Sequence, residues 1–329
     1  MKFTSLPKTY SSYREPLVYE FDTQTAPADV EVRVVEATTG EVIGRKMLYG
    51  VSTARVDIAP FVRRAAEVKL PDTVEYSQML TTGVQVKVKV EVAGVSSSAR
   101  NFIAAKIDTT KTHFILLSEQ ISRRTMARDE FDIIPFYASP DAVVEVLVEA
   151  MGKSYGYLTL EHATGGQAAV AVTALDFDDG PEELKVTFKV DGEVEAEVEY
   201  ELKANLRGAR RLAWLNSTRS PELYTFPMRK SVLVESVRHH IESMLGREAA
   251  AIEHDGELKL LSAYEPQAQL EALGRIIHSE RVWLVEGTVP SRVELRADRV
   301  MTLPCDEMGM VEVDICAAEE GRCYDYAND

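Results

Sequence analysis

The chain has 329 residues and a formal net charge of −16, from 37 basic and 53 acidic side chains. Such an acidic surface repels phosphate groups, so we expect neither nucleic acid nor an anionic membrane surface as a partner. No apolar run approaches the roughly 20 residues that cross a bilayer, so we expect no membrane insertion. The first residues lack the apolar core of a signal peptide, and we expect a protein made in the cytoplasm.

Alternation of apolar and charged residues is the main pattern along the first two thirds of the chain. It is clearest at residues 29–34, 84–92 and 193–202, and turn sequences rich in Gly and Asp separate the alternating runs. This period is typical of antiparallel strands with one face in a core and one in water. We predict two tandem β-sandwich domains, at residues 1–110 and 111–204.

Residues 16–61 and 131–177 resemble each other. Each segment is predicted to form a strand, a hairpin turn, a strand, a second turn and a strand ending in Phe, followed by a long alternating stretch. Two copies of one sandwich would explain the repeat, and chance alternation is the alternative.

The last part of the chain, residues 205–329, differs from the first two. Leu270, Leu273, Ile276 and Ile277 recur at helical spacing behind Pro266, which predicts a helix over 266–278. Strands are expected at 257–261, 281–285, 292–296 and 310–315, while 231–244 fits either a strand or a helix. The predicted fold is thus mostly β, with tandem β-sandwich domains followed by a C-terminal α+β domain. Its acidic tail, 317–329, is expected to be loose or docked by a partner.

Residues with reactive or metal-binding chemistry form no recognisable site. No motif for a nucleophile, a metal or a nucleotide occurs, and no two of the six histidines are spaced as ligands on one helix face. A calcium loop starting at Asp176 would place Gly180 at position 5 and not 6, so an acidic turn is favoured, with a weak calcium or glycan site left open. Cys305, Cys316 and Cys323 are expected to be reduced thiols, with a Cys316–Cys323 bridge as the alternative. We predict no catalytic residue, no cofactor, no metal site and no enzymatic activity.

Two basic clusters lie at the predicted domain joints. One contains Arg123, Arg124 and Arg128, and the other contains Arg210 and Arg211. They could pair with acidic faces of a neighbouring domain or subunit, or be solvated linkers.

Trp214-Leu215-Asn216, followed by Tyr224-Thr225-Phe226, carries a resemblance. The pair of motifs is similar to a signature of β-rich structural proteins encoded in the tail modules of bacteriophages and prophages. A leucine-rich helix and an aromatic strand follow it there, and residues 269–279 and 282–285 have this order here. The residues alone predict a core hairpin, with Asn216 bonded to turn backbone.

The resemblance implies a structural subunit of a virion or tail-like assembly, with no active site. Such a protein would be made in the bacterial cytoplasm and be virion-associated. We expect it to contact other assembly subunits as a homo-oligomer or ring. A module for adhesion to carbohydrate or a receptor is the alternative, and a hydrolase with dispersed carboxylates is third.

Overall fold

In the computed structural model the chain is mostly β, and its described residues form five sheets. The structure describes residues 1–71, 74–80, 83–151, 156–162, 165–177, 181–204, 208–243, 246–286, 289–296, 301–305 and 307–317.

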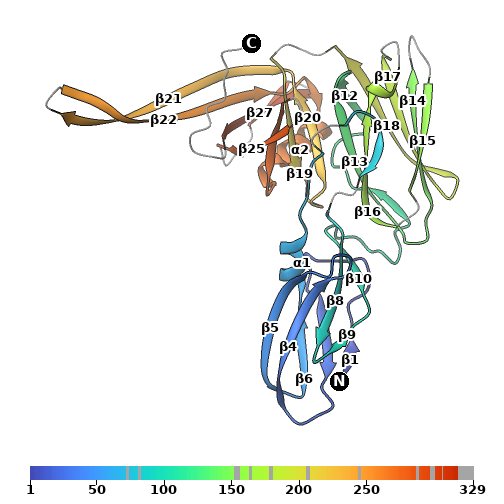
Figure 1. Cartoon of the computed structure of the whole chain (residues 1–329). Helices are drawn as coiled ribbons and strands as arrows, with labels where there is room; N and C mark the ends of the chain where they lie inside the picture. The colour runs from blue at the N-terminus through green and yellow to red at the C-terminus, as the bar shows by residue number, and fades with distance from the viewer. Residues whose placement is uncertain are drawn as a thin grey trace.

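Two facing sheets near the N-terminus share one hydrophobic core. The three-stranded sheet has the order β1 (Lys2–Ser5), β3 (Val18–Asp22), β6 (Thr53–Asp57). The other has the order β2 (Ser11–Ser12), β10 (Arg100–Ile103), β8 (Val86–Val92), β4 (Ala28–Glu36), β5 (Val42–Val51), with β9 (Val95–Ser96) beside β8. Helix α1 (Ala59–Ala65) follows β6 at one end of these sheets (Figure 1). The core forms because the apolar residues of each alternating run face the opposite sheet, as with Val32 and Val88.

A second pair of sheets encloses a second core. One has the order β11 (Phe114–Leu116), β13 (Phe131–Ala138), β16 (Gly166–Thr173), β7 (Gln78–Leu80). The other has the order β12 (Arg123–Ala127), β18 (Glu193–Lys203), β17 (Glu183–Val190), β14 (Val144–Met151), β15 (Gly156–His162). Most strand pairs are antiparallel, as predicted, but β10–β2 and β12–β18 are parallel.

The two similar segments of sequence have the same strand pairing. β3 pairs with β6 as β13 pairs with β16, and β4 pairs with β5 as β14 pairs with β15. The next long strand then joins the hairpin in both, β8 beside β4 and β17 beside β14. The predicted strand ends were wrong, because Phe61 lies in α1 and Phe177 follows the short 3₁₀ helix η1 (Ala174–Asp176).

The C-terminal sheet has nine strands. Its order is β20 (Pro221–Phe226), β19 (Arg210–Leu215), β24 (Val282–Glu286), β25 (Val289–Leu295), β27 (Met308–Ala317), β22 (Gly246–Leu261), β21 (Met228–Ser243), with β23 (Glu265–Pro266) and β26 (Met301–Cys305) paired to β27. The predicted helix is confirmed as α2 (Gln267–Gly274) continued by the 3₁₀ helix η2 (Arg275–His278), and Leu270, Leu273 and Ile276 are buried in the core beside this sheet. The expected strands are confirmed with longer or slightly shifted bounds.

Residues 231–243, which fitted either a strand or a helix, belong to β21. This strand pairs with β22 along its whole length, from Met228 opposite Leu261 to Ser243 opposite Gly246. β27 pairs with β22 only at Glu257–Leu261. Figure 1 shows the remainder extending away from the body as a two-stranded ribbon. This ribbon, residues 233–243 and 246–256, is paired to no third strand within the described part of the chain.

Candidate functional site

The turn between β19 and β20 is organised by Asn216. Its side-chain oxygen accepts hydrogen bonds from the backbone N–H of Thr218 at 2.9 Å and of Ser220 at 3.1 Å. The prediction that Asn216 bonds to turn backbone is confirmed. The hairpin around it is also confirmed as part of a core, because Trp214 and Phe226 are each 1% exposed.

The same turn contacts the N-terminal and central sheets. Gln167 on β16 donates from its amide nitrogen to the Thr218 carbonyl oxygen and to Ser220 Oγ, both at 2.9 Å. Its amide oxygen accepts from the backbone N–H groups of Ala104 and Ala105 at 3.0 and 3.1 Å. One buried glutamine therefore links residues from all three parts of the chain.

Arg219 adds a second contact to the N-terminal part. Its φ angle is +56°, in the left-handed region that favours glycine. The guanidinium donates to the Arg63 carbonyl oxygen at 3.2 Å and lies 6.0 Å from the ring centre of Tyr13. The strained backbone is thus held where the arginine can join the β19–β20 turn to helix α1 and to Tyr13.

Glu222 on β20 is a buried carboxylate with four hydrogen-bond donors. Oε1 accepts from the Glu119 N–H at 2.7 Å and from the Asn216 amide at 2.9 Å. Oε2 accepts from Gln120 Nε2 at 2.8 Å and from Ser118 Oγ at 3.0 Å. Three of these donors, Ser118, Glu119 and Gln120, precede β12, so Glu222 ties the C-terminal sheet to the segment that enters the central sheets.

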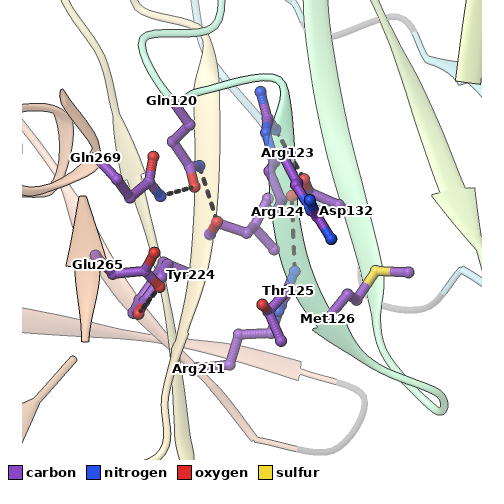
Figure 2. Close-up of a pocket in the computed structure, with 11 residues that line it drawn as sticks. Gln120, Arg123, Arg124, Thr125, Met126, Asp132, Arg211, Tyr224, Glu265 and Gln269 are labelled. Carbon is purple, nitrogen blue, oxygen red and sulfur yellow. Dashed lines mark hydrogen bonds and ion pairs between the residues drawn. The ribbon is translucent and has the colours of Figure 1, made fainter. Parts of the chain in front are cut away.

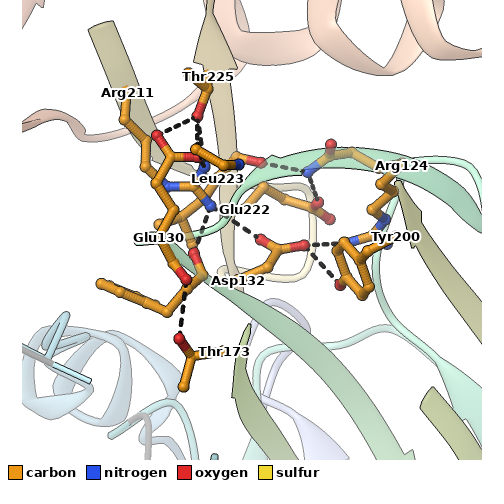
Figure 3. A network of polar contacts seen from close by, with 12 residues as sticks. Arg124, Glu130, Asp132, Thr173, Tyr200, Arg211, Glu222, Leu223 and Thr225 are labelled. Atoms are coloured by element: carbon orange, nitrogen blue, oxygen red, sulfur yellow. Dashed lines mark hydrogen bonds and ion pairs between the residues drawn. The ribbon is translucent and has the colours of Figure 1, made fainter. Parts of the chain in front are cut away.

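A buried ion pair lies beside this carboxylate (Figure 3). Arg124 Nη1 donates to Asp132 Oδ2 at 2.9 Å, and both side chains are 4% exposed. The Tyr200 hydroxyl donates to the same oxygen at 2.8 Å. The second arginine, Arg211, lies with Nη2 3.6 Å from Asp132 Oδ1.

Arg211 also pairs with Glu130. Its Nη1 lies 2.8 Å from Glu130 Oε2 and donates to Thr225 Oγ1 at 2.6 Å. The Thr225 hydroxyl in turn donates to Glu130. We call the charged groups Arg124, Glu130, Asp132, Arg211 and Glu222 the buried junction.

The pKa values of Glu222, Tyr200 and Arg124 are shifted. Burial raises the pKa of Glu222, although the Arg124 charge and the hydrogen bonds from Glu119, Gln120 and Asn216 oppose that shift. Burial and the Asp132 carboxylate both raise the pKa of Tyr200. Burial alone would lower the pKa of Arg124, but the surrounding acidic groups hold it above its usual value. The arginine therefore stays charged.

The space within the junction is too small for a substrate. Figure 2 shows Arg124, Asp132 and Arg211 facing Gln120, Gln269 and the pair Tyr224–Glu265. The cavity between them has a volume of about 10 Å³, which is room for roughly one water molecule. The arrangement orients sheets and offers no opening in which a bound molecule could react.

The predicted basic clusters divide into buried and exposed arginines. Arg124 and Arg211 lie in the buried junction within one chain, so neither belongs to a solvated linker. Arg123 and Arg128 are exposed, and Arg210 is half-buried at the start of β19. Arg123 and Arg124 lie in strand β12, where a linker was one of the two expectations.

Sequence reasoning missed the acidic members of the junction. Asp132 and Glu222 are charged residues inside strands that are otherwise apolar, in FDIIPFYA and PELYTF, and that exception was the available signal. The number of residues between each carboxylate and its partners differs from pair to pair, so no sequence motif of fixed spacing identifies the junction.

The suspected calcium turn and the C-terminal tail lie partly outside the described residues. Asp176 accepts hydrogen bonds from the Ser77 N–H at 2.9 and 3.2 Å, while the rest of the suspected calcium turn, Asp178–Gly180, lies outside the described residues. So do Cys323 and the tail from residue 318 onward. Within the described ranges, no three His, Cys, Asp or Glu side chains form a metal-binding group. No described helix is long and apolar enough to span a membrane.

No protein-family model matches this chain, and no curated protein is similar to it in sequence.

Proposed function

We propose that this protein is a structural subunit of a bacteriophage virion or tail-like assembly and that it acts through contacts between copies of itself. It would be made in the bacterial cytoplasm and be found in the particle.

The ribbon of β21 and β22 carries this proposal. Its free part, residues 246–256 opposite 233–243, extends for about 35 Å at roughly 3.3 Å per residue. An isolated two-stranded hairpin is at best marginally stable in water, and its open edges readily pair with other strands. A ribbon of this length is therefore suited to packing against a neighbouring subunit.

The body is suited to the same role. We infer two tandem β-sandwich domains of one kind, followed by a C-terminal α+β domain, from the repeated strand pairing and the three cores. Gln167, Arg219 and the buried junction join these parts. A body whose parts are cross-linked in this way would hold the ribbon in one direction, as a regular assembly requires.

The test compares the full chain with a variant that has a shortened ribbon. Glu235 and Asp255 face each other in the register, so replacing residues 236–254 by Asn-Gly would close a two-residue hairpin turn between them. We expect the full chain to form an oligomer of fixed mass in light scattering and the shortened chain to remain a monomer, whose mass lies below the 36.6 kDa of one full chain. The same number of subunits for the two proteins at every concentration contradicts the proposal.

The phage assignment has a separate test. Particles purified from the induced host by density gradient should contain peptides of this chain at a fixed ratio to other particle proteins. Their absence from such particles, with the chain present in the cell extract, contradicts the assignment.

A module for adhesion is the second candidate and ranks lower. It calls for aromatic side chains gathered on one exposed face, whereas the exposed Tyr49 lies on β5 of the N-terminal sheets and the exposed Tyr264 follows β22 of the C-terminal sheet.

A further inference from the structure

An apolar groove lies at the root of the ribbon, next to the small cavity of Figure 2, with which it shares Met126, Tyr224 and Glu265. Its volume is about 590 Å³, within the range of roughly 300–1,000 Å³ of pockets that bind ligands. Met126 from β12, Tyr224 from β20, and Pro227 and Met228 at the start of the ribbon contribute to its walls. The central sheets and the C-terminal sheet meet at this groove.

Large apolar side chains are exposed around the groove. Tyr264 is 57% exposed and Met228 is 40% exposed, and both line it. Met308, which is 44% exposed, pairs in register with Pro266, the residue after Glu265 of the groove lining. Methionine side chains adapt to irregular partners, and an apolar surface of this kind commonly marks an interaction site.

Two charged side chains line the groove, Lys203 and Glu265, and the Lys203 ammonium pairs with Glu201 outside the lining. The Tyr224 hydroxyl donates to Glu265 Oε1 at 2.7 Å and accepts from the Ala263 N–H at 3.1 Å. Among the described residues, no cation forms an ion pair with Glu265. Burial raises the pKa of this carboxyl, with the Tyr224 hydrogen bond opposing the shift. The groove therefore fits an apolar group that carries a positive charge.

The sequence that joins the two strands of the ribbon has this chemistry. β21 ends at Ser243 and β22 begins at Gly246, and Met244-Leu245 stands between them, with Arg247 immediately after Gly246. The groove lies at Met228, at the opposite end of the same strand. The two ends are about 50 Å apart along a paired ribbon, so this segment does not reach the groove of its own chain.

We propose that the ribbon end of one copy, residues 243–247, docks in the groove of a second copy. This inference rests on the proposed function, because it names the contact through which the copies assemble. A contact between two different surfaces runs head to tail, and it closes into a ring or continues as a filament. It gives a partner to the apolar groove and to the apolar sequence that joins the two strands of the ribbon.

Three variants test the contact. M244S with L245S removes the apolar end, and A209W fills the groove, which Ala209 lines. A28W adds the same large side chain at an exposed alanine on β4 and is the matched control. Circular dichroism and the urea midpoint establish that each variant is folded. If A209W does not fold, Tyr264→Ala, which trims an exposed wall of the groove, replaces it.

Sedimentation velocity then gives the masses. We expect the ribbon-end variant and the groove variant each to remain monomeric at concentrations at least tenfold above those at which the natural chain and A28W assemble. A mixture of the two variants should form a dimer, because one intact ribbon end meets one intact groove.

Each outcome separates this inference from the function. Assembly of either variant like the natural chain, or a mixture that stays monomeric, overturns the docking proposal alone. A natural chain that is monomeric at every concentration overturns the proposed self-assembly and the docking proposal with it.

Discussion

The side-chain amide of Asn216 donates to Glu222 Oε1 at 2.9 Å and to the Leu117 carbonyl oxygen at 2.8 Å. Asn216 therefore shapes its own turn with its oxygen and holds a buried carboxylate with its nitrogen. The residue that stands out in the Trp-Leu-Asn motif connects the C-terminal hairpin to the central sheets.

Replacing Asn216 by alanine should lower the free energy of unfolding by about 1–3 kcal/mol, because Glu222 and the turn both lose a buried partner. Asn101→Ala is the control, since that amide donates one hydrogen bond of 3.1 Å, to the Tyr10 hydroxyl, in a less buried place. Urea denaturation of both variants measures the effects. A loss no larger than that of the control contradicts the role given to Asn216.

Asp132→Ala should be more damaging. It removes the shared partner of Arg124, Arg211 and Tyr200, and breaking a buried ion pair from one side costs about 3–5 kcal/mol. Glu20→Ala breaks the exposed pair with Arg55, 3.7 Å apart, and should cost at most about 1 kcal/mol. Similar unfolding midpoints for the two variants would show that the buried junction contributes little.

The protein should lose stability in alkali. Burial raises the pKa of Tyr13, Tyr19 and Tyr137 from 10.0 to about 12. Between these values the unfolded chain releases protons that the folded chain keeps, so the free energy of unfolding falls as pH rises from 10 to 12. Phenolate absorbance should show these tyrosines protonated in the folded protein at pH 10.5. Full titration of all tyrosines near pH 10 without unfolding contradicts this.

Glu265→Gln should stabilise the chain relative to the natural protein as pH rises above the ordinary glutamic acid value of 4.5. In the natural protein the raised pKa means that this group favours folding most below that value and loses the effect as pH rises through the folded-state pKa. Glutamine keeps an acceptor for the Tyr224 hydroxyl without the buried charge. Urea denaturation from pH 4 to 7 measures the free energy of unfolding of both proteins. If the advantage of Glu265→Gln over the natural protein stays constant or shrinks as pH rises, this effect is ruled out.

Local sequence patterns were enough for the strands with clear alternation and for the helix. Val86, Val88 and Val90 alternate with lysines because one face of β8 lies in a core, and this period can be read without a structure. Leu270, Leu273 and Ile276 identify α2 and its continuation for the same reason. The ends of elements were less predictable, as Phe61 illustrates. It follows a strand pattern but lies in α1, where Pro60 fits the first turn.

The junction and the ribbon could not be predicted because both depend on long-range pairing. Arg124 and Asp132 are eight residues apart and meet because β12 and β13 belong to two different sheets around one core. Glu130 meets Arg211, 81 residues along the chain. The residues of β21 form a strand and not a helix because they pair with β22. Its own residues fit a strand and a helix equally well.

We propose that the ribbon makes this chain a self-assembling subunit. The most direct measurement is electron microscopy of the full chain over a series of rising concentrations. The account predicts closed rings or tubes with one fixed rotational symmetry, which are absent when residues 236–254 are replaced by Asn-Gly. Single particles of 36.6 kDa at every concentration, or identical assemblies from the shortened chain, would contradict it.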